Sequence, residues 1–189
     1  MMSLCLTAQN KNTSKADKHY YKFEFVEAAS EYSKLVDKGE GNYYVYSKLA
    51  ETYYNIFSTV EAERWYAKAL EIKKDSEMIY KYAQMLKANG KYDKSNQWMQ
   101  TFAKLNPKDK RAIDFKAHPD YILEILNREK KYEIKTLEFN SKASDFGGTI
   151  LNGELYFSSA RNYVRKNYGW NEEPFLDIYK VAFYSDNNT

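Results

Sequence analysis

The residues that could carry out catalysis are few and widely separated in this chain of 189 residues. His19 and His118 stand alone, without the His-Glu-x-x-His spacing that holds zinc on one face of a helix. Ser158-Ser159 lacks the Gly-x-Ser-x-Gly turn of a nucleophilic serine, and no Lys-Ser/Thr follows Gly147-Gly148 as a phosphate-binding loop requires. The Glu172-Glu173 pair is explained more simply by a solvated loop than by acid–base catalysis. The sequence therefore predicts no enzyme, no metal site and no cofactor.

Recognition is the chemistry that the composition favours. The chain has 19 Tyr, 10 Phe and 3 Trp, which make 17% of the residues, but only 7 Gly and 3 Pro. A chain so poor in turn-forming residues is expected to consist mostly of long helices. Tyr suits half-buried contacts between helices, because its ring packs while its hydroxyl reaches water.

Charge gives no sign of nucleic-acid binding. The 29 basic and 26 acidic residues are well mixed and leave a net charge of +3. A nucleic-acid surface needs a concentrated basic stripe. The densest basic run, 108–111, contains Asp109 and is interpreted as the solvated start of a helix.

The first nine residues are largely apolar and have the small residue Ala8 before a polar stretch, as the end of a secretory signal peptide does. We expect 1–9 to be a signal-peptide remnant with cleavage after Ala8. Two alternatives are a lipoprotein attached at Cys5, although Met2-Ser3-Leu4 lacks the usual small residue, and a frayed terminus. Cys5 is the only cysteine, so neither an intrachain disulfide nor a cysteine-based zinc site can form.

A repeat of 33–34 residues runs through the first half of the chain and must position any binding residues. Each repeat is predicted to be a helical hairpin, in which small residues let the two helices approach and large ones fill the space between hairpins. Three columns share the period: Ala16, Ala50 and Ala83; Ala28, Ala62 and Ser95; Tyr32, Tyr66 and Met99. In the third repeat Gly90 is placed where the first helix should end in a left-handed residue.

The segments 53–70 and 90–107 resemble tetratricopeptide repeats, in particular Glu61-Ala62-Glu63-Arg64-Trp65-Tyr66-Ala67-Lys68-Ala69-Leu70 and Gly90-Lys91-Tyr92-Asp93 through Asn106-Pro107. We therefore expect three such repeats over 10–107. His19 and Ser95 depart from the pattern. An unrelated helical bundle is the alternative.

This resemblance implies a concave face lined by the first helix of each hairpin, where such proteins hold their partners. Family geometry, counted from the shared period, places eleven candidate partner-binding residues there: Asp17, Tyr20, Tyr21, Tyr44, Ser47, Glu51, Tyr54, Asn55, Tyr80, Gln84 and Lys87. Clustered tyrosines suit recognition, because they bring a large contact area at low entropic cost. The alternative is that many of these tyrosines only pack between hairpins.

Two capping helices are expected at 108–131, because the exposed end of a repeat array needs covering. Asp109 can cap the first helix, Pro119 interrupts it, and 120–126 resumes a helical pattern.

After residue 131 the period changes from helical to alternating. A strand is expected at 132–139, a turn at Asp145-Phe146-Gly147-Gly148, and a hairpin at Asn152-Gly153 that leads into a strand at 154–159. A long polar loop precedes a last strand at 176–183, and 184–189 is a polar tail. Three or four strands leave open edges, so 132–183 is interpreted as the first blade of an incomplete β-propeller.

Three motifs in this region, 140–147, 156–161 and 170–179, follow the repeats in an order that resembles OmpA-family outer-membrane proteins of the PorE type. That family has tetratricopeptide repeats, a WD40-like propeller and later domains that bind peptidoglycan. The resemblance implies a mainly α fold, a helical solenoid followed by a small antiparallel β segment, in a chain truncated at both ends.

The resemblance further implies a protein–protein interaction scaffold of the periplasm and outer membrane, associated with type IX secretion. Its partners would be cell-envelope or secretion proteins and not nucleic acid, with membrane association only through partners or missing domains. The alternative function is a carbohydrate- or peptidoglycan-binding module that uses the Tyr-rich groove.

Overall fold

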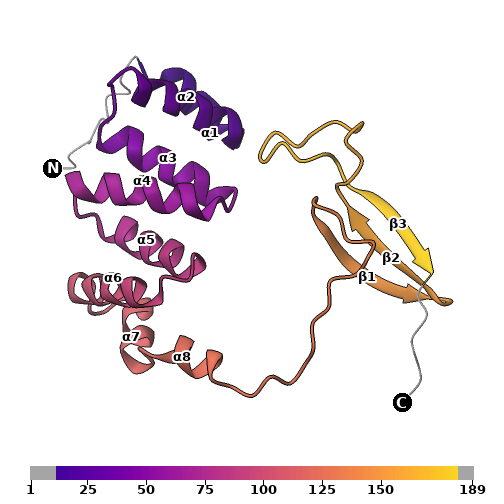
Figure 1. The fold of residues 1–189 in the computed structure, drawn as a ribbon. Helices are drawn as coiled ribbons and strands as arrows, with labels where there is room; N and C mark the ends of the chain where they lie inside the picture. The colour runs from indigo at the N-terminus through magenta and orange to yellow at the C-terminus, as the bar shows by residue number, and fades with distance from the viewer. Residues whose placement is uncertain (1–11, 183–189) are drawn as a thin grey trace. The chain divides into compact units, whose positions relative to one another are not determined.

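The computed structural model describes residues 12–182, which form eight helices and three strands (Figure 1). The chain divides into two compact units, residues 1–129 and residues 130–189. The first unit is helical and the second contains the strands, so the mainly α fold with a small antiparallel sheet is confirmed. The expected signal-peptide remnant at 1–9 and the tail at 184–189 lie outside the described residues.

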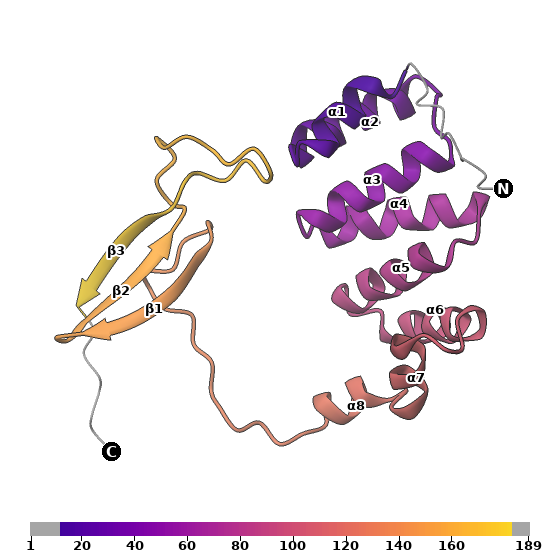
Figure 2. The same ribbon diagram turned by 180° about the vertical axis from the view of Figure 1, so that it is seen from behind.

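The first unit is a series of antiparallel helical hairpins stacked one after another (Figures 1 and 2). The nine residues of the three periodic columns are all buried, which is why the period is so regular. The helices are α1 Ser14–Tyr21, α2 Phe25–Asp37, α3 Tyr43–Asn55, α4 Thr59–Ile72, α5 Ser76–Ala88, α6 Tyr92–Leu105, α7 Lys110–Ala117 and α8 Tyr121–Leu126.

Side-chain caps start three of these helices at the spacing of the repeat. Asn42 accepts a hydrogen bond from the amide of Val45 at 3.1 Å, and Asp75 accepts one from the amide of Met78 at 3.2 Å. Asp109 begins α7 in the same way, with the amide of Arg111 at 2.8 Å. Because Asp109 follows Asp75 by one period, α7 takes the place of the first helix of a fourth hairpin and packs on α6.

The turn within each hairpin contains one residue in the left-handed conformation. Gly90 has φ 73°, as its place in the sequence predicts. Phe23 and Phe57 take the same conformation at the same place in the first two hairpins, with φ 61° and 57°. A bulky residue is strained there, because its Cβ approaches the following carbonyl oxygen.

Contacts between successive hairpins fix their order. The Asn89 side chain donates hydrogen bonds to the Thr59 carbonyl at 3.2 Å and to Glu63 at 2.8 Å. Lys91 bonds Glu63 as well, at 2.7 Å. The turn of the third hairpin is thereby fastened to α4 of the second.

The second unit contains one antiparallel sheet in the order β1-β2-β3 (Figure 2). Its strands are β1 Asp145–Leu151, β2 Glu154–Ser159 and β3 Asp177–Ala182. Asn152 and Gly153 form the expected hairpin turn, with φ 52° and 78°. The expected turn at 145–148 is wrong: these residues belong to β1, where Gly147 at φ 70° makes a bulge.

The strand expected at 132–139 is also wrong. The structure has no regular element there, and Tyr132 and Ile134 are 79% and 89% exposed. The alternating pattern is real, but no neighbouring strand pairs with this segment among residues 12–182. Without such a partner the backbone cannot form a ladder.

In the described part of the chain, no helix combines the length and apolar character needed to cross a membrane.

Candidate partner-binding groove

The eleven predicted binding residues all lie on the first helices of the three hairpins, α1, α3 and α5. The structure gives them three different roles. Some are buried supports, some form a charged network between helices, and some line cavities, while Tyr21 and Asn55 are exposed and have none of these roles.

Asp17 and Ser47 are corrected first, because both are buried and cannot contact a partner. Asp17 is 1% exposed and accepts hydrogen bonds from the hydroxyls of Tyr32, Tyr44 and Thr13 at 2.5, 2.7 and 2.8 Å. Ser47 donates to the carbonyl of Tyr43, one turn back in its own helix, at 2.7 Å. The helix turns these two side chains inward, toward neighbouring helices.

Burial raises the pKa of the Tyr32 and Tyr44 hydroxyls well above their ordinary value, and their hydrogen bonds to Asp17 act in the same direction. Both phenols therefore stay protonated and remain donors to the Asp17 carboxylate. Tyr44 belongs to this support as much as to the groove surface. Tyr21 and Asn55, by contrast, are exposed.

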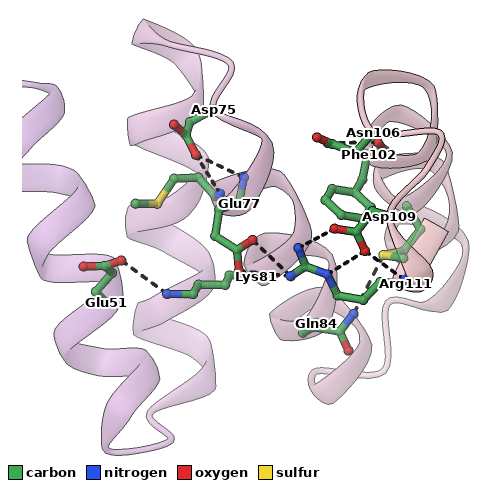
Figure 3. Close-up of polar contacts among 11 residues, drawn as sticks. Glu51, Asp75, Glu77, Lys81, Gln84, Phe102, Asn106, Asp109 and Arg111 are labelled. Atoms are coloured by element: carbon green, nitrogen blue, oxygen red, sulfur yellow. Dashed lines mark hydrogen bonds and ion pairs between the residues drawn. The ribbon is translucent and has the colours of Figure 1, made fainter. Parts of the chain in front are cut away.

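Glu51 of α3 joins the first helices of the three hairpins. Its carboxylate accepts a hydrogen bond from the Tyr20 hydroxyl of α1 at 3.0 Å and pairs with Lys81 of α5 at 3.2 Å (Figure 3). Lys48, one turn earlier in α3, lies 3.8 Å from the same carboxylate, with its ammonium 3.9 Å from the centre of the Tyr20 ring. Burial, followed by the Glu51 charge, raises the pKa of Tyr20. This network uses its polar groups internally.

Arg111 of α7 forms a second network, which sequence reasoning missed. Its guanidinium bonds Asp109 at 2.9 Å and Glu77 at 3.1 Å (Figure 3). It also lies 4.2 Å from the centre of the Tyr80 ring and 4.9 Å from that of Phe102. The run 108–111 is thus not simply a solvated helix start. The 34-residue spacing of Glu77 and Arg111 was the signal that could have found it.

Tyr80, Gln84 and Lys87 are brought together by α5 and line two adjoining cavities. The first, of about 450 Å³, is also bounded by Met99, Phe115 and Tyr121. The second, of about 550 Å³, is also bounded by Tyr54, Phe57, Tyr92 and Ile122. Four predicted residues therefore meet at this site, whose other walls come from α6, α7, α8 and the turn after α3.

Lys87 is the cation that lines both cavities. Its ammonium donates to the Tyr121 hydroxyl at 2.6 Å and lies 5.2 Å from the centre of that ring. Within residues 12–182 no carboxylate pairs with it, whereas Lys81 and Arg111 both have carboxylate partners. The site therefore carries a positive charge that the protein does not balance by an ion pair.

The polar residues of the second unit hold its sheet together. Asp145 accepts hydrogen bonds from Arg161 at 2.8 Å and from the Ser141 amide at 2.6 Å. Arg161 also donates to the carbonyl of Phe139 at 2.9 Å, and its guanidinium lies 4.9 Å from the centre of the Phe157 ring. In the part of the chain described, no group of three or more His, Cys, Asp or Glu could hold a metal ion.

No protein-family model matches the chain, and no curated protein matches it either. Among solved structures, it is similar to the second TPR domain of the human RPAP3 protein, determined by NMR in complex with the HSP70 peptide SGPTIEEVD. The two are 18% identical, with a TM-score of 0.48, and the similarity covers 55% of this chain and 87% of that one.

Proposed function

We propose that this chain is a protein–protein interaction scaffold whose second and third hairpins, together with α7 and α8, hold a peptide segment of a partner. The observation that carries the proposal is the convergence of Tyr54, Tyr80, Gln84 and Lys87 on two adjoining cavities. Concave sites with aromatic walls and a few polar groups are typical binding sites.

The chemistry of the walls favours a peptide over a glycan. A sugar ring stacks on an open aromatic face, but Arg111 and Phe102 already lie against Tyr80. Tyr54 packs edge-on against Tyr66, and the Lys81 ammonium lies 5.3 Å from its ring centre. Apolar side chains entering the cavities could instead use ring edges and the apolar walls of Met85, Met99 and Phe115.

We further propose that the partners are proteins of the periplasm and outer membrane, with type IX secretion as the process served. This rests on the motif order that resembles OmpA-family proteins of the PorE type. The sheet is compatible with one propeller blade, since Phe146 and Ile178 flank Ser158 in the register and are both exposed. A blade presents apolar side chains of this kind to its neighbour.

Photo-crosslinking tests the proposal on the full chain. A photoreactive phenylalanine analogue replaces Asn55, which is exposed on α3 next to the cavity-lining Tyr54, or Gln100, which is exposed on α6 as a control. We expect discrete adducts with envelope proteins from position 55 and none of these from position 100. Adducts from position 100 alone would contradict the groove, and adducts with cytosolic proteins alone would contradict the cellular setting.

Soluble peptidoglycan fragments serve as a competitor in the same experiment. They should leave the adducts from position 55 unchanged. Their suppression at low concentration would favour the carbohydrate-binding alternative.

A further inference from the structure

Lys87 and the two cavities beside it specify more than a general peptide site. A partly buried ammonium whose bonded partner is a neutral hydroxyl is incompletely compensated. An incoming carboxylate can join Tyr121 in bonding Lys87, because an ammonium has three donors. Each cavity beside Lys87 has apolar walls, from Met99 and Phe115 on one side and from Phe57 and Ile122 on the other. Asp114 also lines the first cavity, where its carboxylate lies 4.0 Å from the Lys110 ammonium.

Phe57 gives independent support for the second cavity. It stands where the third hairpin has Gly90, it is strained at φ 57°, and it is 72% exposed. Phe23 has the same conformation in the first hairpin, is 68% exposed and packs edge-on against Phe25, whereas Phe57 lines the second cavity. Strained residues that persist in a fold often belong to functional sites.

We propose that the site binds a segment in which one acidic side chain lies between two large apolar side chains. This inference rests on the proposed function. The acidic side chain pairs with Lys87, and the apolar side chains enter the two cavities. The occupant is thus a segment of a partner protein, chosen by charge complementarity with Lys87 and by the apolar walls on either side.

Selection from a displayed library of random 12-residue peptides on the full chain provides the test. We expect enrichment of Asp or Glu flanked on both sides by Leu, Ile, Met, Phe or Trp. Fluorescence anisotropy then measures a selected peptide against variants of the protein. Lys87→Met should weaken binding about tenfold, as loss of a charge-assisted hydrogen bond does. Lys94→Met, at an exposed position of α6, should not change it.

A charge exchange separates direct contact from a structural effect. Lys87→Glu should abolish binding of the acidic peptide and restore binding of the peptide whose acid is replaced by Lys. Phe57→Gly should weaken binding about tenfold, which corresponds to a typical interface contact. Phe23→Gly removes the same strain outside the cavities and should leave the affinity unchanged.

The results of these experiments separate failure of the acidic motif from failure of the scaffold function. Absence of an enriched acidic position, equal loss with Lys94→Met, or failure of the charge exchange overturns this inference. Selected peptides that crosslink from position 55 but need no acid overturn the motif and leave the scaffold function standing. If the selected peptides crosslink only from position 100, both proposals fail.

Discussion

Phe57 and Gly90 occupy equivalent positions in successive hairpins and share one backbone conformation. In each, the amide of the next residue closes the turn, from Ser58 to the carbonyl of Tyr53 at 2.9 Å and from Lys91 to the carbonyl of Leu86 at 2.8 Å. Glycine adopts this left-handed geometry without steric cost, but phenylalanine does not. The hydrogen bonds therefore determine the conformation of the turn. They do not account for phenylalanine as the residue at position 57.

Phe57→Gly should raise the free energy of unfolding of the helical unit by roughly 0.5–1 kcal/mol. Relief of left-handed strain gives about 1–2 kcal/mol, of which the greater unfolded-state entropy of glycine cancels about half. Urea denaturation followed by circular dichroism at 222 nm measures the change. Gly90→Ala, which introduces strain at the equivalent position, should have the opposite sign. Destabilisation by Phe57→Gly would show that the ring supports the fold.

Asp17→Ala should destabilise the helical unit by about 2–4 kcal/mol. The substitution leaves the buried hydroxyl of Tyr32 and the half-buried hydroxyl of Tyr44 without their acceptor, and each unmet group costs about 1–3 kcal/mol. The measurement is again urea denaturation, with Asp37→Ala at the exposed end of α2 as the control. Equal and small effects of the two substitutions would contradict a buried supporting role for Asp17.

The helical unit should lose stability steeply above about pH 10. Burial is the main cause that raises the pKa of seven tyrosines in residues 12–129: Tyr20, Tyr32, Tyr43, Tyr44, Tyr66, Tyr80 and Tyr82. Above the ordinary pKa of 10, the unfolded chain loses these protons while the native chain retains them. Unfolding then releases protons, so stability falls as pH rises, by about 1.4 kcal/mol per pH unit for each such tyrosine.

Absorbance of tyrosinate at 295 nm distinguishes this mechanism from general alkaline damage. The seven tyrosines with raised pKa should ionise together with the loss of helical circular dichroism, in one cooperative step. Ionisation of all tyrosines before the helices melt would contradict the expectation.

The helical hairpins could be predicted because burial imposes one residue size at each recurring position. Ala50 and Ala62 are fully buried where α3 packs on α4, so only a small side chain fits at these positions. The alanine columns in the sequence therefore indicate the fold. The Asn152-Gly153 turn was equally predictable, since both residues need positive φ. The sequence could not distinguish a turn from a bulge at Gly147, because either structure uses glycine in the same conformation.

The candidate site was only half predictable for a different reason. Counting by the period finds the helix α5 and its residues Tyr80, Gln84 and Lys87, but not which side chains the packing turns inward. Asp17 is buried because Tyr32 of its own hairpin and Tyr44 of the next hairpin both reach it, and the second contact lies outside any single repeat. The cavity walls from α7 and α8 likewise follow from tertiary packing.

Asp145→Asn should lower the stability of the sheet in the second unit, although the substitution hardly changes the size of the side chain. Hydrogen bonds from Ser159, Arg161 and the Ser141 amide hold the pKa of the Asp145 carboxyl well below its usual range. The ionised carboxylate therefore contributes stability above about pH 4, the ordinary pKa, and this contribution is lost as pH falls through the lower native pKa. Asn keeps one acceptor but loses the charge, at a cost of about 1–2 kcal/mol.

Amide hydrogen exchange at neutral pH measures the loss of stability at the amides close to Asp145. In Asp145→Asn the amide of Ser141, 2.6 Å from the carboxylate, and the amides of β2 should exchange about 5–30 times faster, the factor that 1–2 kcal/mol implies. The exposed control Glu138→Gln should not alter these exchange rates.

Lowering the pH of the wild-type protein below 4 should increase the exchange rates of the same amides, after correction for intrinsic exchange. This acid effect should be smaller in Asp145→Asn. Equal acid sensitivity in the two proteins would mean that other carboxylates, such as Asp177 with its bonds to Arg165, govern the acid stability of the sheet.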